Sequence, residues 1–167
     1  MKTPLLLTLL LVLLPGCSQT TDGGIPIGPA WVTLAYVGLY YAFMTQVLRT
    51  KIRLGRAYQE RGEKFDRYYS QDREMLAADR IQLNMLEHMP IFLVLLWLHA
   101  LVGSIDEATI TGGIYVAARA AYPFVLGGRL GRAVPKRLLF VTFTGYAVLA
   151  FQLVRIGMGL VGASSAG

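Results

Sequence analysis

The sequence predicts an all-α integral membrane protein, a bundle of four transmembrane helices. Of its 167 residues, 54% are hydrophobic and only 16% are charged, whereas soluble domains carry about a quarter charged residues. The apolar residues gather in four long runs that are separated by basic or polar links. In lipid every backbone polar group needs a partner within the protein, so these runs are expected to be helices. The length fits one domain and is too short for a transporter of two repeated halves.

The first 17 residues, MKTPLLLTLLLVLLPGC, have the features of a leader peptide. Lys2 gives a positive start, Leu5 to Leu14 form an apolar run, and the Leu-x-Gly-Cys sequence that ends at Cys17 resembles the lipid-attachment site of bacterial lipoproteins. Ten helical residues rise only about 15 Å, half of a bilayer core. We therefore expect residues 1–17 to be a signal or lipoprotein leader and residues 18–167 to form the membrane domain. An uncleaved N-terminus is the alternative.

Four predicted spans follow the leader. They run from Ile25 to Leu48, from about Glu87 to Val102, from Ala108 to about Leu126, and from Leu138 to Val161. Each is close to the roughly twenty residues that a bilayer requires, the second being extended by polar turns that precede it. The third span contains Arg119 and the fourth contains Arg155. Charged side chains inside a membrane are usually paired and often functional.

Most basic residues lie in the two links on one side of the membrane. Of the 16 Lys and Arg residues, nine fall within residues 49–80 and four within residues 129–137, and none lies between the second and third spans. Cytoplasmic links are enriched in Lys and Arg, so we expect both basic links in the cytoplasm and both termini in the periplasm of a bacterial inner membrane. The net charge of +6 then reflects topology and contact with lipid headgroups, and a nucleic-acid partner has little support.

The longer basic link also contains six acidic residues, and most of it is expected to be a solvated extension of the flanking helices. Lys51, Arg53 and Arg56 directly follow the first span. They are expected either to reach lipid headgroups or to line a cavity on the cytoplasmic face. The single cysteine, Cys17, excludes an internal disulfide, and two histidines without further cysteines give no credible metal site.

A polar stripe precedes the second span. Arg80, Asn84 and Glu87 have the spacing i, i+4, i+7, which places them within about 60° of arc on one helix face. The energetic cost excludes lipid as the environment of this face. Either the three residues pair with neighbours inside the bundle, or they bind a ligand.

A second stripe lies in the third span, where Tyr115, Arg119 and Tyr122 have the same spacing. Arg132 follows in the basic link after this span. An arginine at this depth needs an anionic partner, for which Glu87 and an anionic ligand are the two candidates. Cations, an amide, a carboxylate and phenols together suit a small zwitterionic ligand with several carboxylates.

Both stripes resemble the motifs of one family. The pattern Arg-x-x-x-Asn-x-x-Glu-x-x-Pro, ending here at Pro90, resembles the second-helix signature of the MAPEG family, the membrane-associated proteins in eicosanoid and glutathione metabolism. YVAARAAYPF resembles its third-helix pattern Arg-x-x-Tyr. The resemblance covers about residues 31–161 and indicates a bacterial-type member. The family includes microsomal glutathione transferases, leukotriene and prostaglandin synthases, and a non-enzymatic lipoxygenase-activating protein.

The resemblance implies a homotrimer of four-helix bundles that binds glutathione, as a co-substrate, between subunits near the cytoplasmic face. It implies a transferase or peroxidase that acts on lipophilic electrophiles or lipid peroxides from the membrane. The resemblance also assigns the catalytic role, thiolate stabilisation, to Arg132 as the match to a family arginine shortly after the third helix. A nearby guanidinium favours the thiolate of a thiol whose pKa is ordinarily about 8.5. The alternative is a non-catalytic member that binds a lipid or a partner protein in the same cleft. The implied glutathione-binding residues are Arg80, Asn84, Glu87, Arg119 and Tyr122.

Overall fold

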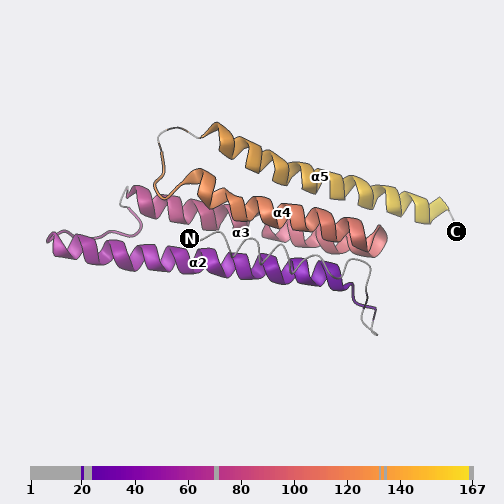
Figure 1. The fold of residues 1–167 in the computed structure, drawn as a ribbon, viewed down its shortest axis with the longest axis horizontal. Helices are drawn as coiled ribbons and strands as arrows, with labels where there is room; N and C mark the ends of the chain where they lie inside the picture. The colour runs from indigo at the N-terminus through magenta and orange to yellow at the C-terminus, as the bar shows by residue number, and fades with distance from the viewer. Residues whose placement is uncertain (1–19, 21–23, 70–71, 132, 134, 166–167) are drawn as a thin grey trace.

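In the computed structural model the described part of the chain forms a bundle of four helices, which alternate in direction (Figure 1). The structure describes residues 20, 24–69, 72–131, 133 and 135–165, so the predicted leader with Cys17 and the predicted catalytic Arg132 lie outside the described residues. The helices are α2 (Ile27–Glu60), α3 (Arg73–Val102), α4 (Ile105–Leu126) and α5 (Lys136–Ser165). Each overlaps one predicted span, which confirms the all-α fold.

Three of the described helices, α2, α3 and α5, are long and apolar enough to cross a membrane. Helix α4 has 22 residues, which is about 33 Å and still sufficient for a bilayer core. Its hydropathy is lowered by two acidic residues in its first turn, Asp106 and Glu107, and by Arg119. Because α4 packs against α2, α3 and α5, the rest of the bundle covers much of this polar helix.

The basic link is largely helical, as expected. Helix α2 continues beyond the predicted span to Glu60, and α3 begins at Arg73, well before the predicted second span. Leu54 of α2 is buried against Met75 and Ala78 of α3 in a small cluster separate from the main core. These contacts hold the two extensions together at the basic end of the bundle.

An aromatic layer crosses the middle of the core. Tyr36 of α2, Phe92 of α3 and Tyr115 of α4 are fully buried. The rings of Phe92 and Tyr115 stack with their centroids 4.2 Å apart, and those of Tyr36 and Phe92 are 4.8 Å apart. The Tyr36 hydroxyl donates a hydrogen bond of 2.8 Å to the carbonyl oxygen of Met85. Since aromatic pairs contribute about 0.5–1.5 kcal/mol beyond their buried area, this layer fixes the register of α2, α3 and α4.

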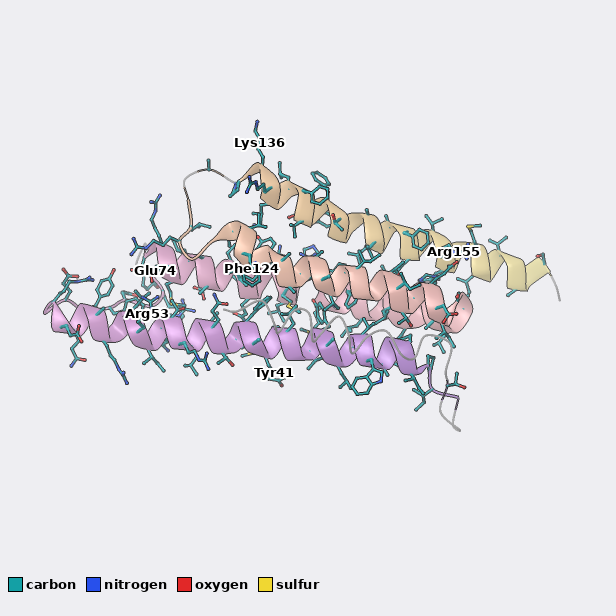
Figure 2. All side chains as sticks on the ribbon, in the orientation of Figure 1. Tyr41, Arg53, Glu74, Phe124, Lys136 and Arg155 are labelled. Carbon is teal, nitrogen blue, oxygen red and sulfur yellow. The ribbon has the colours of Figure 1, made fainter. Side chains whose placement is uncertain are left out.

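The link between α4 and α5 is attached to the start of α3. Gly127, at a φ of 84°, ends α4 in a conformation that favours glycine. The backbone N–H of Leu130 then donates a hydrogen bond of 2.9 Å to the carbonyl oxygen of Arg73. This part of the second basic link therefore lies beside the first, at the end of the bundle where Figure 2 labels Arg53 and Glu74.

Candidate functional site

The outer face of α3 carries two charged residues of the predicted site. Arg80 and Glu87 are exposed on the isolated bundle, and Asn84 between them is half-buried. Arg73, seven residues before Arg80 at the start of α3, is exposed on the same face, and most of the remaining exposed residues there are apolar. The exposed large hydrophobic residues of this face are Leu76, Leu83, Leu86, Ile91, Val94, Leu98 and Leu101.

The inner edge of this polar stripe is joined to α4 by a buried arginine. Arg119 is only 2% exposed, and its Nη1 donates a hydrogen bond of 2.5 Å to Oδ1 of Asn84. Its Nη2 donates to the hydroxyl of Tyr115 at 2.9 Å, and its Cζ lies 4.8 Å from the centre of the Tyr115 ring. These acceptors are a neutral amide and a neutral phenol. Glu87, the carboxylate expected as one candidate partner, is exposed on the outer face instead.

Tyr122, the remaining described residue of the predicted site, is 4% exposed and belongs to the main hydrophobic core. The structure therefore brings Asn84 and Arg119 into direct contact and places Tyr122 in the same interior. Arg80 and Glu87 lie on the adjoining outer surface of α3.

Two further residues, Gly145 and His88, contact Arg119 and Asn84, and the sequence alone gave little indication of either contact. A Cβ added at Gly145 of α5 would lie 3.2 Å from Nη2 of Arg119, so the absence of a side chain there makes room for the guanidinium. His88 bonds through Nδ1 with the carbonyl oxygen of Asn84 at 2.9 Å, and its ring centre is 5.4 Å from that of Tyr146. A single glycine in an apolar helix does not indicate which side chain it faces, so Gly145 was missed.

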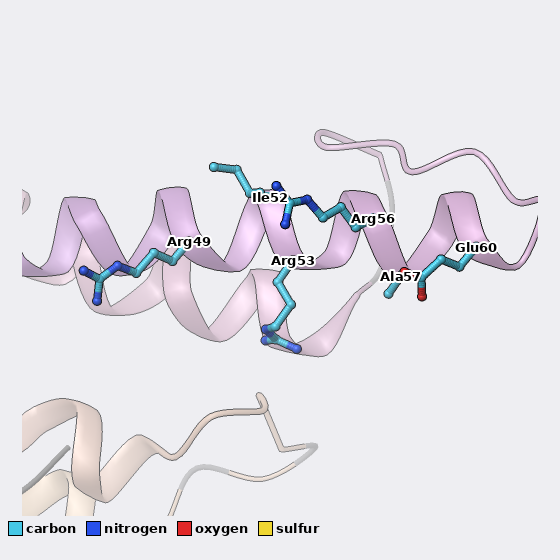
Figure 3. Close-up of a pocket in the computed structure, with 6 residues that line it drawn as sticks. All are labelled: Arg49, Ile52, Arg53, Arg56, Ala57 and Glu60. Atoms are coloured by element: carbon cyan, nitrogen blue, oxygen red, sulfur yellow. The ribbon is translucent and has the colours of Figure 1, made fainter.

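A cavity of about 440 Å³ lies along the last turns of α2 (Figure 3). It is bordered by three arginines at the spacing i, i+4, i+7, of which Arg53 forms an ion pair with Glu74 of α3. Glu74 also pairs with Arg129 at 2.8 Å. Arg53 and Arg56 thus line this cavity and Lys51 does not; that the cavity opens on the cytoplasmic face stays a prediction. The lining residues are Arg49, Ile52, Arg53, Arg56, Ala57 and Glu60, and the predicted glutathione-binding residues are not among them.

A second polar group lies at the other end of the bundle. Arg155 of α5 donates to both carboxylate oxygens of Glu107, at 2.7 Å and 2.8 Å. His99 of α3 is fully buried, and its Nε2 lies 3.4 Å from the same carboxylate. The sequence contained the signal for this pair, because Glu107 and Arg155 fall at the same end of adjacent spans. The ion pair between Arg155 and Glu107 is structural, since it neutralises an arginine within an apolar helix.

Among the described residues, no group of three or more His, Cys, Asp or Glu side chains is placed to hold a metal ion. The comparison with known families is more informative. The model of the MAPEG family matches residues 29–158, which is most of the chain. The protein belongs to the MAPEG family.

The match to MAPEG proteins includes almost all of α2, the whole of α3 and α4, and most of α5. It therefore contains every described residue of the candidate site. MAPEG proteins are membrane bundles, so this chain is an integral membrane protein whose outer surface contacts lipid. A comparison with individually curated proteins gives no match.

Proposed function

We propose that this MAPEG protein is a glutathione-dependent membrane transferase or peroxidase that acts on lipophilic electrophiles or lipid peroxides. The observation that carries the proposal is a guanidinium, an amide and a carboxylate, from Arg80, Asn84 and Glu87, on one edge of a largely apolar helix face. A guanidinium pairs with carboxylates, a carboxylate pairs with an ammonium group, and an amide bonds peptide groups. Glutathione carries two carboxylates, one ammonium group and two peptide bonds, which is the complementary set.

A homotrimer would complete the site. Arg80 and Glu87 are exposed on the isolated bundle, and a charge that faces lipid at depth costs a few kcal/mol on insertion scales. Leu76, Arg80, Leu83 and Glu87 are spaced by four, three and four residues, the alternation found where helices pack in a seam. A neighbouring subunit on this face would cover both charges and leave room between the subunits for a polar ligand.

The same proposal gives roles to the residues around the stripe. Arg80, Asn84 and Glu87 would hold the ends and backbone of glutathione, with Arg119 and Tyr122 forming the layer behind them. Arg132 would lie near the sulfur and favour the thiolate. Leu130, two residues before Arg132 in sequence, is bonded to the start of α3, and this attachment supports a position for the second basic link at the glutathione end.

The chemistry needs little more than an activated thiol and an apolar approach. The thiolate attacks an electrophilic carbon, a C–S bond forms, and the leaving group departs with its electron pair. With a lipid peroxide, two glutathione molecules are oxidised to the disulfide while the peroxide is reduced to an alcohol and water. The apolar surface of α3 adjoins the polar stripe, so a lipophilic substrate could enter from the membrane. We place this site at the cytoplasmic face of a bacterial inner membrane, with both termini in the periplasm, because the basic links gather at this end.

Turnover of an aryl halide and of a lipid hydroperoxide by the purified protein in detergent, with glutathione, tests the proposal. We expect saturable, glutathione-dependent turnover. Arg132→Ala should lower kcat while glutathione binding falls less, since it removes thiolate stabilisation. The matched control is Arg61→Ala, which removes an exposed arginine just after α2 whose contacts, an ion pair with Glu63 and stacking on Tyr58, lie outside the proposed site, and it should leave turnover unchanged.

Absence of turnover in a wild-type protein that still binds glutathione would contradict the enzyme assignment. That outcome would favour the alternative, a non-catalytic member that binds a lipid or a partner in the same cleft.

A further inference from the structure

The guanidinium of Arg119 is buried among neutral acceptors. Within the described residues it donates to the amide oxygen of Asn84 and the hydroxyl of Tyr115, and its Nε has no partner. Buried charges are ordinarily paired with an opposite charge. An arginine kept at 2% exposure without a carboxylate is costly, and such intramembrane groups commonly mark functional sites.

The chemistry of arginine decides how the amide of Asn84 is turned. Arginine only donates hydrogen bonds, so the atom of Asn84 that faces Arg119 is the carbonyl oxygen Oδ1, independently of how the amide is assigned. The planar amide then directs its Nδ2, with two N–H donors, away from Arg119. Nδ2 is not among the buried polar atoms that lack a partner. Since Asn84 lies between buried Arg119 and exposed Arg80 and Glu87, its donors are directed toward the outer face of α3.

We propose that Arg119 is a positioning residue that orients Asn84 so that its N–H groups, and not its carbonyl oxygen, meet the ligand. The ligand group opposite Asn84 must then be a hydrogen-bond acceptor, a carboxylate or a peptide carbonyl. Arg119 acts on the ligand through Asn84 and does not contact it. The inference rests on the proposed function, which places the ligand on this face of α3.

Besides its contacts with Asn84 of α3 and Tyr115 of α4, Arg119 also lies close to the backbone of α5 at Gly145. A Cβ at Gly145 would lie 3.2 Å from Nη2 of Arg119 and 3.5 Å from Cε2 of Tyr115. The first distance is tighter than an ordinary contact, so Gly145→Ala should displace the guanidinium without altering any of Arg80, Asn84 and Glu87. Orientation of Asn84 is therefore coupled to a residue outside the glutathione-binding stripe.

The decisive variant is Asn84→Asp, compared with wild type for glutathione affinity and for melting temperature without ligand. Aspartate keeps an oxygen acceptor for Arg119 and adds an opposite charge, so the melting temperature should stay at or above that of wild type. It lacks both N–H donors, so glutathione binding should weaken by at least about tenfold. Turnover should show the loss in KM for glutathione, with kcat at saturating glutathione largely kept.

If wild type binds glutathione and Asn84→Asp binds it equally well, the positioning inference is overturned while the proposed function stands. If wild type does not bind glutathione, the proposed function itself is wrong. Gly145→Ala provides a second test that does not alter Asn84, and it should weaken glutathione binding several-fold. Its control is Gly38→Ala in α2, where an added Cβ has nothing within 4 Å and binding should match wild type. Wild-type affinity in Gly145→Ala would also contradict the inference.

Discussion

Arg155 of α5 binds both carboxylate oxygens of Glu107 of α4, at 2.7 Å and 2.8 Å, and so joins two helices near the end of the bundle that is remote from Arg53 and Glu74 (Figure 2). His99 of α3 lies 3.4 Å from the same carboxylate, so three helices meet at one side chain. Glu107→Gln removes the counter-charge of Arg155, and we expect a melting temperature lower by several degrees in detergent.

Two controls separate this ion pair from surface charge in general. Glu63→Gln breaks the exposed pair with Arg61 and should leave the melting temperature unchanged, because exposed pairs contribute little. The double variant Glu107→Leu/Arg155→Leu should recover much of the loss, because it leaves no uncompensated charge. A double variant less stable than Glu107→Gln alone would contradict this reading of the pair.

The outer face of α3 should form the contact between subunits. In a Cys17→Ser background, Val94→Cys places a single thiol on this face, where Val94 is 57% exposed on the isolated bundle. Oxidation should give covalent pairs of subunits, and native mass spectrometry of wild type should show a trimer. Leu153→Cys on α5, at 61% exposure, is the matched control and should remain single. Equal cross-linking at both positions would contradict the predicted interface.

Topology follows from the distribution of charge. Thirteen of the 16 basic residues lie in the two links at one end of the bundle, and this end should be cytoplasmic. Reporter fusions after Gly167 and within residues 60–70 should therefore report opposite sides of the membrane, with the C-terminus periplasmic. A cytoplasmic C-terminus would invert the orientation proposed for the glutathione site.

The leader should be removed, with Cys17 as the mature N-terminus. The short apolar run and the Leu-x-Gly-Cys sequence are the reasons for this expectation. The intact mass of protein purified from membranes should correspond to a start at residue 17, and lipid attachment should add mass that Cys17→Ser abolishes. A mass that begins at Met1 would show that this segment is retained.

The positions of the helices were predictable because the apolar runs are long and the links between them are basic or polar. The predicted spans ending at Val102 and about Leu126 match the ends of α3 and α4. An extension of the helices into the longer basic link was likewise expected from its mixed charges, and α2 continues to Glu60. These features depend on hydrophobicity and local sequence, both of which can be read without knowledge of tertiary packing.

It was less predictable that Asn84 would be half-buried while Arg80 and Glu87 are exposed. Spacing places Arg80, Asn84 and Glu87 within about 60° of arc, but that arc crosses the boundary between the outer face and the core. Asn84 lies on the side nearest to buried Ile81 and Met85, so α4 reaches it while the other two remain exposed. The location of this boundary depends on how α3 and α4 pack, which spacing within one helix does not determine.

The central claim is that the polar stripe of α3 binds glutathione, and glutathione-induced stabilisation measures it most directly. At a concentration 100 times Kd, binding should stabilise the folded protein by about 2.7 kcal/mol, and the melting temperature of wild type and of the control Arg61→Ala should rise together. Arg80→Ala and Glu87→Gln should keep their ligand-free melting temperature, and at the same glutathione concentration their stabilisation should fall to between about 1.4 and about 0.4 kcal/mol, because removal of one charged partner weakens binding roughly ten- to a hundred-fold. No shift in wild type at saturating glutathione, together with a Glu87→Gln variant that melts earlier without ligand, would show instead that the stripe serves packing alone.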